Sequence, residues 1–159
     1  LTNLPADLLA AIDGMLPPRW SRNNPVDLAA GETRDTIPDL LELVARHPGT
    51  DSILQLGLGI QGNTAALTRR GPFHPDHGLE RIVDFHERQE RRYAEAASEA
   101  SARHSKPVLV ASELAVTQPE NPMVTAVRES GRLCYPSADR AVAALGHLVR
   151  YAAWLKART

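Results

Sequence analysis

The stretch that most constrains the fold is residues 51–63, where a short apolar run leads directly into closely spaced glycines. Ile53 to Leu58 is mostly apolar, and Gly57, Gly59 and Gly62 follow in close succession. This pattern predicts a buried parallel strand that ends in a glycine-rich turn. Glycines at that end of a strand let the backbone approach a ligand, and the amides of a following helix N-terminus favour an anion. The sequence therefore predicts a binding site here, but it indicates only loosely which chemistry the site performs.

Other apolar runs predict further strands of the same sheet, with helical patterns between them. Residues 106–111 indicate a second buried strand, residues 132–135 a short last strand, and residues 20–28 an edge strand or a structured loop. Helical spacing is found in residues 4–16, 35–47, 64–70, 78–105, 121–127 and 137–155.

This alternation predicts an α/β fold. We expect a single domain over residues 1–159, a three-layer open parallel sheet of the flavodoxin-like or Rossmann-like kind, with about four strands and helices on both faces. Ligands bind such sheets at the carboxyl ends of the strands. Here those ends are Asp27 to Ala30, Gly57 to Asn63, Ser112 to Thr117 and Tyr135 to Ser137.

Two helices carry clear apolar stripes. The long helix over 78–105 has its stripe at Leu79, Ile82, Val83, His86, Tyr93, Ala97 and Ala100, and its charged residues predict a solvated opposite face. The final helix has a stripe at Ala141, Leu145, Leu148, Ala152 and Leu155, which Val142 and Val149 widen.

Charge and cysteine content limit the partners and the compartment. Lys plus Arg number 18 against 19 for Asp plus Glu, which gives no electrostatic footprint for nucleic acid or an anionic membrane. The one cysteine, Cys134, excludes an internal disulfide framework and fits a reducing cytoplasm. No apolar run is long enough to predict a membrane span. The chain begins at Leu1 rather than Met, so we expect a fragment or a processed product.

Several motifs allow rival interpretations. Gly57 to Gly62 matches the dinucleotide string G-x-G-x-x-G, with Glu80 where a ribose-binding acid is sought, but a Pro- and His-containing loop stands where a helix and second strand belong. A turn that needs positive φ angles, without a ligand, explains the glycines equally. His74 and His77 share that loop but lack a third ligand in a recognisable frame, so no metal site is predicted. The sequence also contains no string typical of nucleophilic catalysis.

Asn24-Pro25-Val26-Asp27-Leu28 is the most specific string in the chain. By itself it is also a turn in which Asn and Asp satisfy amides beside a rigid proline. With other segments in the same order, it makes the chain resemble the C-terminal flavodoxin-like ligase domain of NDP-forming acyl-CoA synthetases, relatives of succinyl-CoA synthetase and of ADP-forming acetate-CoA ligase. The other segments are Leu16-Pro17, Thr50-Asp51, Lys106-Pro107-Val108, Gly131, Tyr135-Pro136 and Ala141 to Leu145.

The resemblance implies a cytoplasmic acid–thiol ligase that makes acyl-CoA through a phosphohistidine and an acyl phosphate. It implies that Gly57, Gly59, Gln61, Gly62 and Asn63 face phosphate, and that Asn24, Asp27 and Glu113 shape the site. No catalytic residue and no tightly bound cofactor are assigned to this chain; CoA, ATP or ADP and Mg²⁺ belong to the full enzyme.

The chain differs from that family in what it lacks. The family's first strand with its Thr-Asn-x-Gly-Gly loop, its Ser-His-Thr-Gly histidine loop and its ATP-grasp region have no match here. We therefore expect catalysis only together with CoA-binding and ATP-grasp partners, whereas a homo-oligomer stays open. The alternatives are a non-catalytic scaffold or regulatory domain, which uses the helix over 78–105 for assembly, and an NAD-binding oxidoreductase domain.

Overall fold

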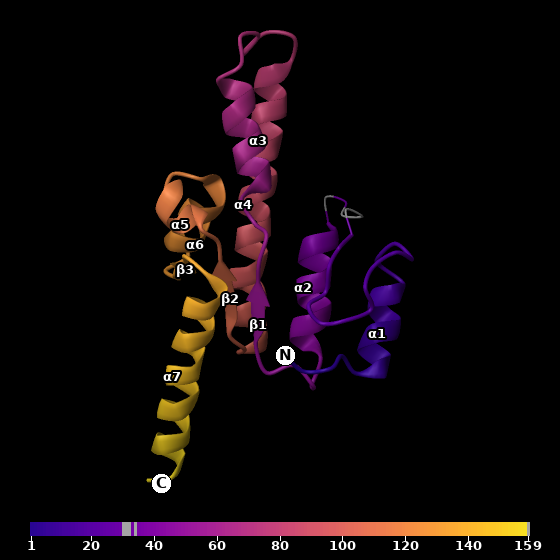
Figure 1. Ribbon diagram of the computed structural model, residues 1–159, viewed down its shortest axis with the longest axis vertical. Coiled ribbons are helices and arrows are strands. Elements are labelled where there is room, and N and C mark those ends of the chain that lie inside the picture. The colour runs from indigo at the N-terminus through magenta and orange to yellow at the C-terminus, as the bar shows by residue number, and fades with distance from the viewer. Residues whose placement is uncertain (30–32, 34, 159) are drawn as a thin grey trace.

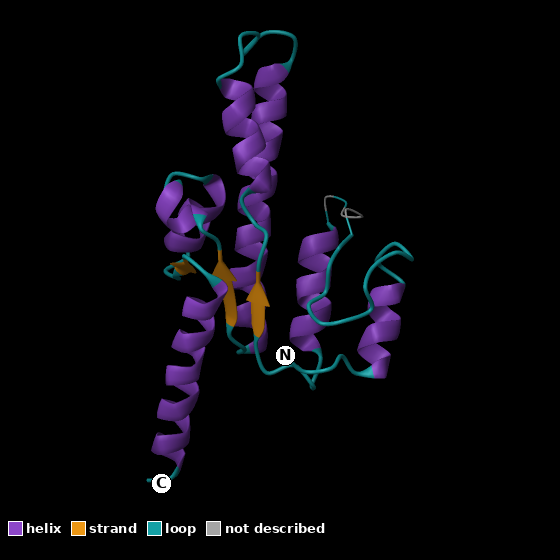
Figure 2. Cartoon of the chain, in the orientation of Figure 1, coloured by secondary structure: helices purple, strands orange, loops and turns teal. Residues whose placement is uncertain are grey.

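The computed structural model describes residues 1–29, 33 and 35–158. The fold is α/β, with short strands and longer helices (Figure 2). In chain order the elements are α1 (Ala6–Asp13), α2 (Thr36–Arg46), β1 (Ile53–Gln55), α3 (Ile60–Arg69), α4 (Leu79–His104), β2 (Val108–Ala111), α5 (Leu114–Thr117), α6 (Pro122–Glu129), β3 (Cys134–Tyr135) and α7 (Ala138–Lys156).

The sheet is parallel, as the sequence predicts, but smaller than expected. Its order is β1-β2-β3, with Ile53 opposite Val108 and Ala111 opposite Tyr135. The part of the chain that is described therefore contains three strands rather than about four. β1 is shorter than the predicted run and half-buried, because it lies at an edge and the chain leaves the extended region at Gly57, where φ is +77°.

The sequence allows an edge strand or a structured loop over residues 20–28, and the structure has a loop there. Arg22 and Ala29 have positive φ angles of 50° and 54°, which turn the chain away from an extended path. Asp27 Oδ1 accepts a hydrogen bond from the Ala29 amide at 3.0 Å, so Asp27 builds a turn. Ala30, the last residue of the predicted strand end Asp27 to Ala30, lies outside the described residues.

The two faces of the sheet pack against different helices. Val108 and Val110 belong to the main core cluster, which includes buried residues of α2, α4 and α6. Leu109 and Ala111 point the other way and pack against Ala141 of α7. β2 is buried at every position, as predicted, because helices cover both of its faces.

Helix α4 is the spine of the molecule (Figure 1). It packs against α2, α3, α6 and β2, and it follows the predicted helix closely, with Gly78 and Ser105 at its caps. Its first turns form a projecting hairpin with α3, where α3 alone lies beside it in Figure 1. Ile82, predicted to line the buried stripe, is 41% exposed there.

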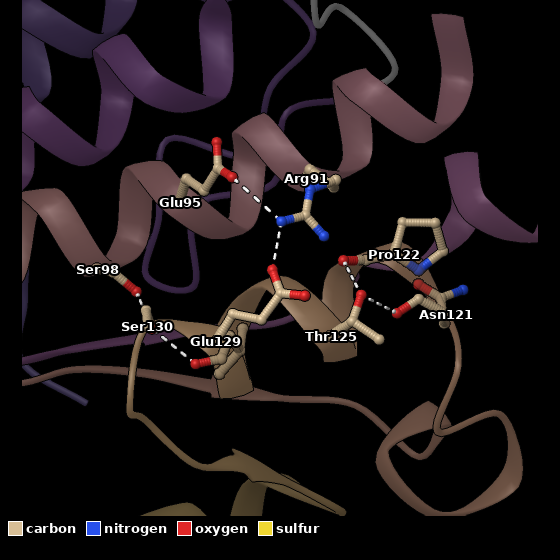
Figure 3. Close-up of polar contacts among 9 residues, drawn as sticks. Arg91, Glu95, Ser98, Asn121, Pro122, Thr125, Glu129 and Ser130 are labelled. Atoms are coloured by element: carbon tan, nitrogen blue, oxygen red, sulfur yellow. Dashed lines mark hydrogen bonds and ion pairs between the residues drawn. The ribbon is translucent and has the colours of Figure 1, made fainter. Parts of the chain in front are cut away.

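Polar contacts join α4 to α6 (Figure 3). Arg91 of α4 forms ion pairs with Glu95 and with Glu129, and Ser98 Oγ is hydrogen-bonded to Ser130 Oγ at 2.9 Å. The contacts of Glu129 and Ser130 join α4 to the C-terminal end of α6, whereas the Arg91–Glu95 pair lies within α4.

A second, smaller core lies between α1, α2 and the loop that joins them. Leu8, Ile12, Trp20 and Leu40 are buried in it. Trp20 Nε1 donates a hydrogen bond to Asp13 Oδ1 at 2.8 Å, which ties the loop to the end of α1.

None of the helices in the described ranges combines the length and the apolar character that crossing a membrane requires.

Candidate anion site at the glycine turn

The glycine turn joins β1 to α3 and depends on two left-handed backbone positions. Gly59 is the N-cap of α3 and has φ 106°, which L-residues rarely adopt. A Cβ at Gly59 would lie 2.1 Å from Leu114 Cδ1, so a side chain there would also force the buried Leu114 to move. At Gly57, where φ is 77°, a Cβ would meet no atom within 4 Å. Both glycines are needed for backbone shape, but only Gly59 is needed for packing.

Residues that follow β2 hold the turn from one side. Ser112 Oγ donates to the Leu58 carbonyl at 3.5 Å, and Asn121 Nδ2 donates to the Gly59 carbonyl at 3.3 Å. Asn121 Oδ1 accepts from the Met123 amide at 3.0 Å and so caps α6 as well. Because Asn121 is only 4% exposed, these bonds are shielded from water.

The turn's amides converge on a carboxylate from α4. Gly59 N–H donates to Glu90 Oε1 at 2.7 Å, and Gly62 N–H donates to Glu90 Oε2 at 3.1 Å. We call the N–H groups of Gly59, Gln61 and Gly62 the amide cradle. Glu90 is 1% exposed, so the chain buries an acidic side chain to fill this cradle.

The electrostatics of Glu90 reflect two opposing effects. Burial raises the pKa of the Glu90 carboxyl above its ordinary value, and hydrogen bonds from the amide cradle lower it again in part. The first amides of α3 carry the positive end of the helix dipole, which favours the ionised carboxylate. The arrangement can therefore hold an oxyanion without a metal ion or an arginine, and here the Glu90 carboxyl group fills it.

The other predicted phosphate-facing residues have separate surroundings. Gln61 Oε1 is hydrogen-bonded to His86 Nδ1 of α4. Asn63 Oδ1 is buried and has no hydrogen-bond partner among the described residues. Gly57 lies in the turn but, unlike Gly59 and Gly62, donates no recorded hydrogen bond to Glu90. The proposed contact of these residues with phosphate stays a prediction.

The predicted site-shaping residues divide between two places. Glu113 is exposed, follows β2 and immediately precedes Leu114, the residue that packs on Gly59, so it borders the glycine turn. Asn24 and Asp27 lie instead in the loop between α1 and α2. Asn24 Nδ2 donates to the Thr2 carbonyl at 2.9 Å, and Asp27 bonds to Ala29. Their recorded hydrogen bonds therefore stabilise that loop rather than the glycine turn.

Sequence reasoning missed Glu90 and Asn121 as parts of this site. Glu90 lies in the charge run of the long helix, but it is seven residues after buried Val83 and three before buried Tyr93. That spacing places an acidic side chain on the buried stripe, which was the available signal. Asn121 is the first residue of the helix predicted over 121–127, but its bond to Gly59 needs the tertiary fold.

The remaining candidates are far less organised. Glu80 lies in the first turn of α4, at the hairpin tip, and not at the end of a second strand where a ribose-binding acid belongs. His74 and His77 lie in the loop at that tip, where His77 contacts the Phe73 ring edge to face. Over the described ranges, no three His, Cys, Asp or Glu side chains are grouped so that they could hold a metal ion.

Together these features define a parallel α/β protein whose glycine turn binds its own carboxylate. Comparison of the chain with protein-family models, curated proteins and solved structures found no significant match.

Proposed function

We propose that the chain is the flavodoxin-like domain of an NDP-forming acyl-CoA synthetase, with the amide cradle directed at the phosphorylated histidine of a partner domain. Catalysis then requires CoA-binding and ATP-grasp partners, because this chain contributes no nucleophile. The resemblance in the order of segments, from Asn24-Pro25-Val26-Asp27 to Tyr135-Pro136, suggests the family. The parallel order β1-β2-β3 is compatible with it.

The observation that carries this proposal is the convergence of two backbone amides on one anion. Gly59 and Gly62 donate to separate oxygens of the Glu90 carboxylate at 2.7 and 3.1 Å. Two oxygens of a phosphoryl group can accept the same pair of N–H groups at similar distances. The cradle is therefore suited to an oxyanion, whether the oxyanion is a carboxylate or a phosphate.

The same observation sets a condition on the proposed activity. A phosphoryl group and the Glu90 carboxylate cannot occupy the cradle together, because they would compete for the same donors and repel each other. Glu90 must therefore leave the cradle when phosphohistidine enters. A change in the Glu90 side-chain conformation is the direct way to achieve this, because the Gln61–His86 hydrogen bond and the Arg69–Glu87 ion pair also hold α4 against α3.

Phosphotransfer in a reconstituted system tests the proposal. The CoA-binding domain and ATP-grasp subunit of an ADP-forming acetate-CoA ligase are supplied in trans, with ATP labelled in its γ-phosphate, acetate and CoA. We expect acid-labile label on histidine and acetyl-CoA formation to increase when the chain is added. The control replaces it with heat-denatured chain. No dependence of either product on the folded chain would refute the synthetase role.

A non-catalytic scaffold or regulatory domain is the second candidate, and the filled cradle favours it. If Glu90 never leaves, the glycine turn is a structural joint between α3, α4 and α6. A thermal-unfolding scan with inorganic phosphate, ATP, CoA and NAD(H) separates the candidates. Stabilisation by phosphate in a Glu90→Ala variant but by nothing in the wild type favours the scaffold, whereas stabilisation of the wild type by NAD(H) alone favours the oxidoreductase alternative.

A further inference from the structure

The second half of helix α7 has almost no cover. Ala141 in its first turn is fully buried against the sheet, but every described residue from His147 to Arg158 is exposed. Figure 1 shows α7 running past the end of the sheet, away from the other helices. The predicted apolar stripe is therefore buried at its start, at Ala141. From His147 onwards the helix is exposed to solvent, with Leu148 60% and Trp154 49% exposed.

This uncovered segment, residues 147–158, is also basic. From residue 140 to the end of the sequence there are four cations and one histidine but no acidic residue; these are Arg140, Arg150, Lys156, Arg158 and His147. The chain as a whole has a net charge of −1, so the positive charge is concentrated locally.

The apolar side chains extend around most of the helix. At 3.6 residues per turn, Leu148 and Leu155 share one face with Tyr151 beside them, and Val149 and Trp154 lie towards the two flanks. The side opposite Leu148 carries one cation, Arg150, among small residues, which are Ala143, Gly146, Ala153 and Ala157. A helix that is apolar around most of its circumference is typically buried by protein.

We propose that residues 147–158 insert into an apolar groove with an acidic rim on a partner protein. A second copy of α7 is disfavoured, because two such helices would bring their cations together without an acidic residue to offset them. An anionic membrane is disfavoured because an interfacial helix keeps a strongly charged polar face, whereas the face opposite Leu148 has the single cation Arg150 among alanine and glycine. This inference does not depend on the proposed synthetase role.

The available surface is large enough for a specific complex. Five half-exposed large apolar side chains lie in residues 147–158: Leu148, Val149, Tyr151, Trp154 and Leu155. With roughly 100 Å² from each, the helix and its groove would bury about 1,000 Å² in total, the lower limit for a specific interface.

Trp154 provides a direct reporter of docking. It stacks on Tyr151 with ring centroids 5.9 Å apart, and the Arg158 guanidinium lies 4.2 Å from its ring centroid. The other tryptophan, Trp20, is buried in the core near α1, so its emission should stay constant. A blue shift of the tryptophan fluorescence that disappears in Trp154→Phe therefore reports burial of the exposed part of α7.

The experiment titrates the full chain with two synthetic amphipathic helices that share one leucine stripe. One carries glutamate at all other positions and the second carries lysine. We expect the leucine–glutamate peptide to shift Trp154 emission, with an apparent affinity that falls as salt rises, and the leucine–lysine peptide to give no shift. The triple variant Arg150→Glu, Lys156→Glu, Arg158→Glu should lose the shift, whereas Arg81→Glu with Arg103→Glu, on α4, should keep it.

Four results would overturn the proposal. Equal shifts with both peptides would mean apolar contact without charge recognition. A shift only with phosphatidylglycerol vesicles would identify a membrane surface, and concentration-dependent dimerisation that buries Trp154, without binding of either peptide, would identify a second copy. Absence of a shift with every probe would mean that α7 stays solvated.

Discussion

Replacing Glu90 by alanine should destabilise the protein strongly, although Glu90 is an acidic residue that burial disfavours. The change leaves the amides of Gly59 and Gly62 buried without their acceptor. Each unsatisfied buried group costs about 1–3 kcal/mol, and relief of the buried charge offsets part of this. We expect a net loss of about 2–4 kcal/mol, which lowers the unfolding midpoint on the order of 10 °C for a domain of this size.

The pH dependence of the isosteric variant Glu90→Gln isolates the charge. Burial raises the pKa of Glu90 in the folded state, so the folded protein holds its proton at a higher pH than the unfolded chain does. The stability that Glu90 provides is then fully present below the unfolded value of 4.5 and is lost as the pH rises through the folded pKa. The unfolding free energy of the wild type relative to Glu90→Gln should therefore decrease as the pH rises from 4 to 7.

Urea unfolding, followed by circular dichroism, measures both effects, and anion rescue gives the decisive control. Acetate or phosphate should stabilise Glu90→Ala in a saturable way, by about 2.7 kcal/mol at one hundred times the dissociation constant, and should stabilise the wild type less, because there Glu90 competes for the same amides. A Glu90→Ala variant as stable as the wild type, with no anion effect, would refute the cradle as a stabilising contact.

Three further predictions test the surroundings of the cradle and the second core. Gly59→Ala should cost more than about 3 kcal/mol or prevent folding, because the new Cβ would lie 2.1 Å from Leu114, whereas Gly57→Ala should cost only the left-handed penalty of about 1–2 kcal/mol in urea unfolding. Asn121→Ala should cost about 2–3 kcal/mol, because it removes a helix cap and a buried bond to Gly59, and Asn24→Ala should cost about 1 kcal/mol or less in the same assay. The hydrogen bond from Trp20 lowers the pKa of Asp13, so its stabilisation should be present above the ordinary value of 3.8 and be lost as the pH falls below it. Asp13→Ala should therefore lower the thermal midpoint more at pH 7 than at pH 2, with Asp13→Asn as the control that keeps an acceptor for Trp20.

The sequence predicted the elements whose signals are local. The helix over 78–105, the buried strand ending at Ala111 and the helix over 121–127 each depend on residues within a few positions of one another, and the structure contains all three. For residues 20–28 the sequence allowed two interpretations, an edge strand or a structured loop, and the loop is correct. The loop forms because Arg22 and Ala29 adopt positive φ angles. The pattern of side chains does not reveal these angles, because arginine and alanine usually avoid them.

Contacts between distant segments were harder to predict for a physical reason. Periodicity indicates which side of α7 is apolar, but not where the sheet ends, so the buried Ala141 and the exposed Leu148 look equivalent in the sequence. The same limit hid the relation of Glu90 to Gly59, which are 31 residues apart. Only the antiparallel hairpin of α3 and α4 brings them together.

The occupant of the cradle therefore decides what the glycine string means. A strand, a glycine turn and a helix N-terminus always produce unsatisfied amides, and those amides need an anion or water. In a ligand site the anion comes from outside, whereas in this chain an acidic residue on the buried stripe of the neighbouring helix supplies it. A glycine-rich turn is thus better evidence for an external ligand when no buried position of a neighbouring helix carries a carboxylate. Here Glu90 occupies such a position. A phosphate would therefore have to compete with the Glu90 carboxylate for the amides of Gly59 and Gly62.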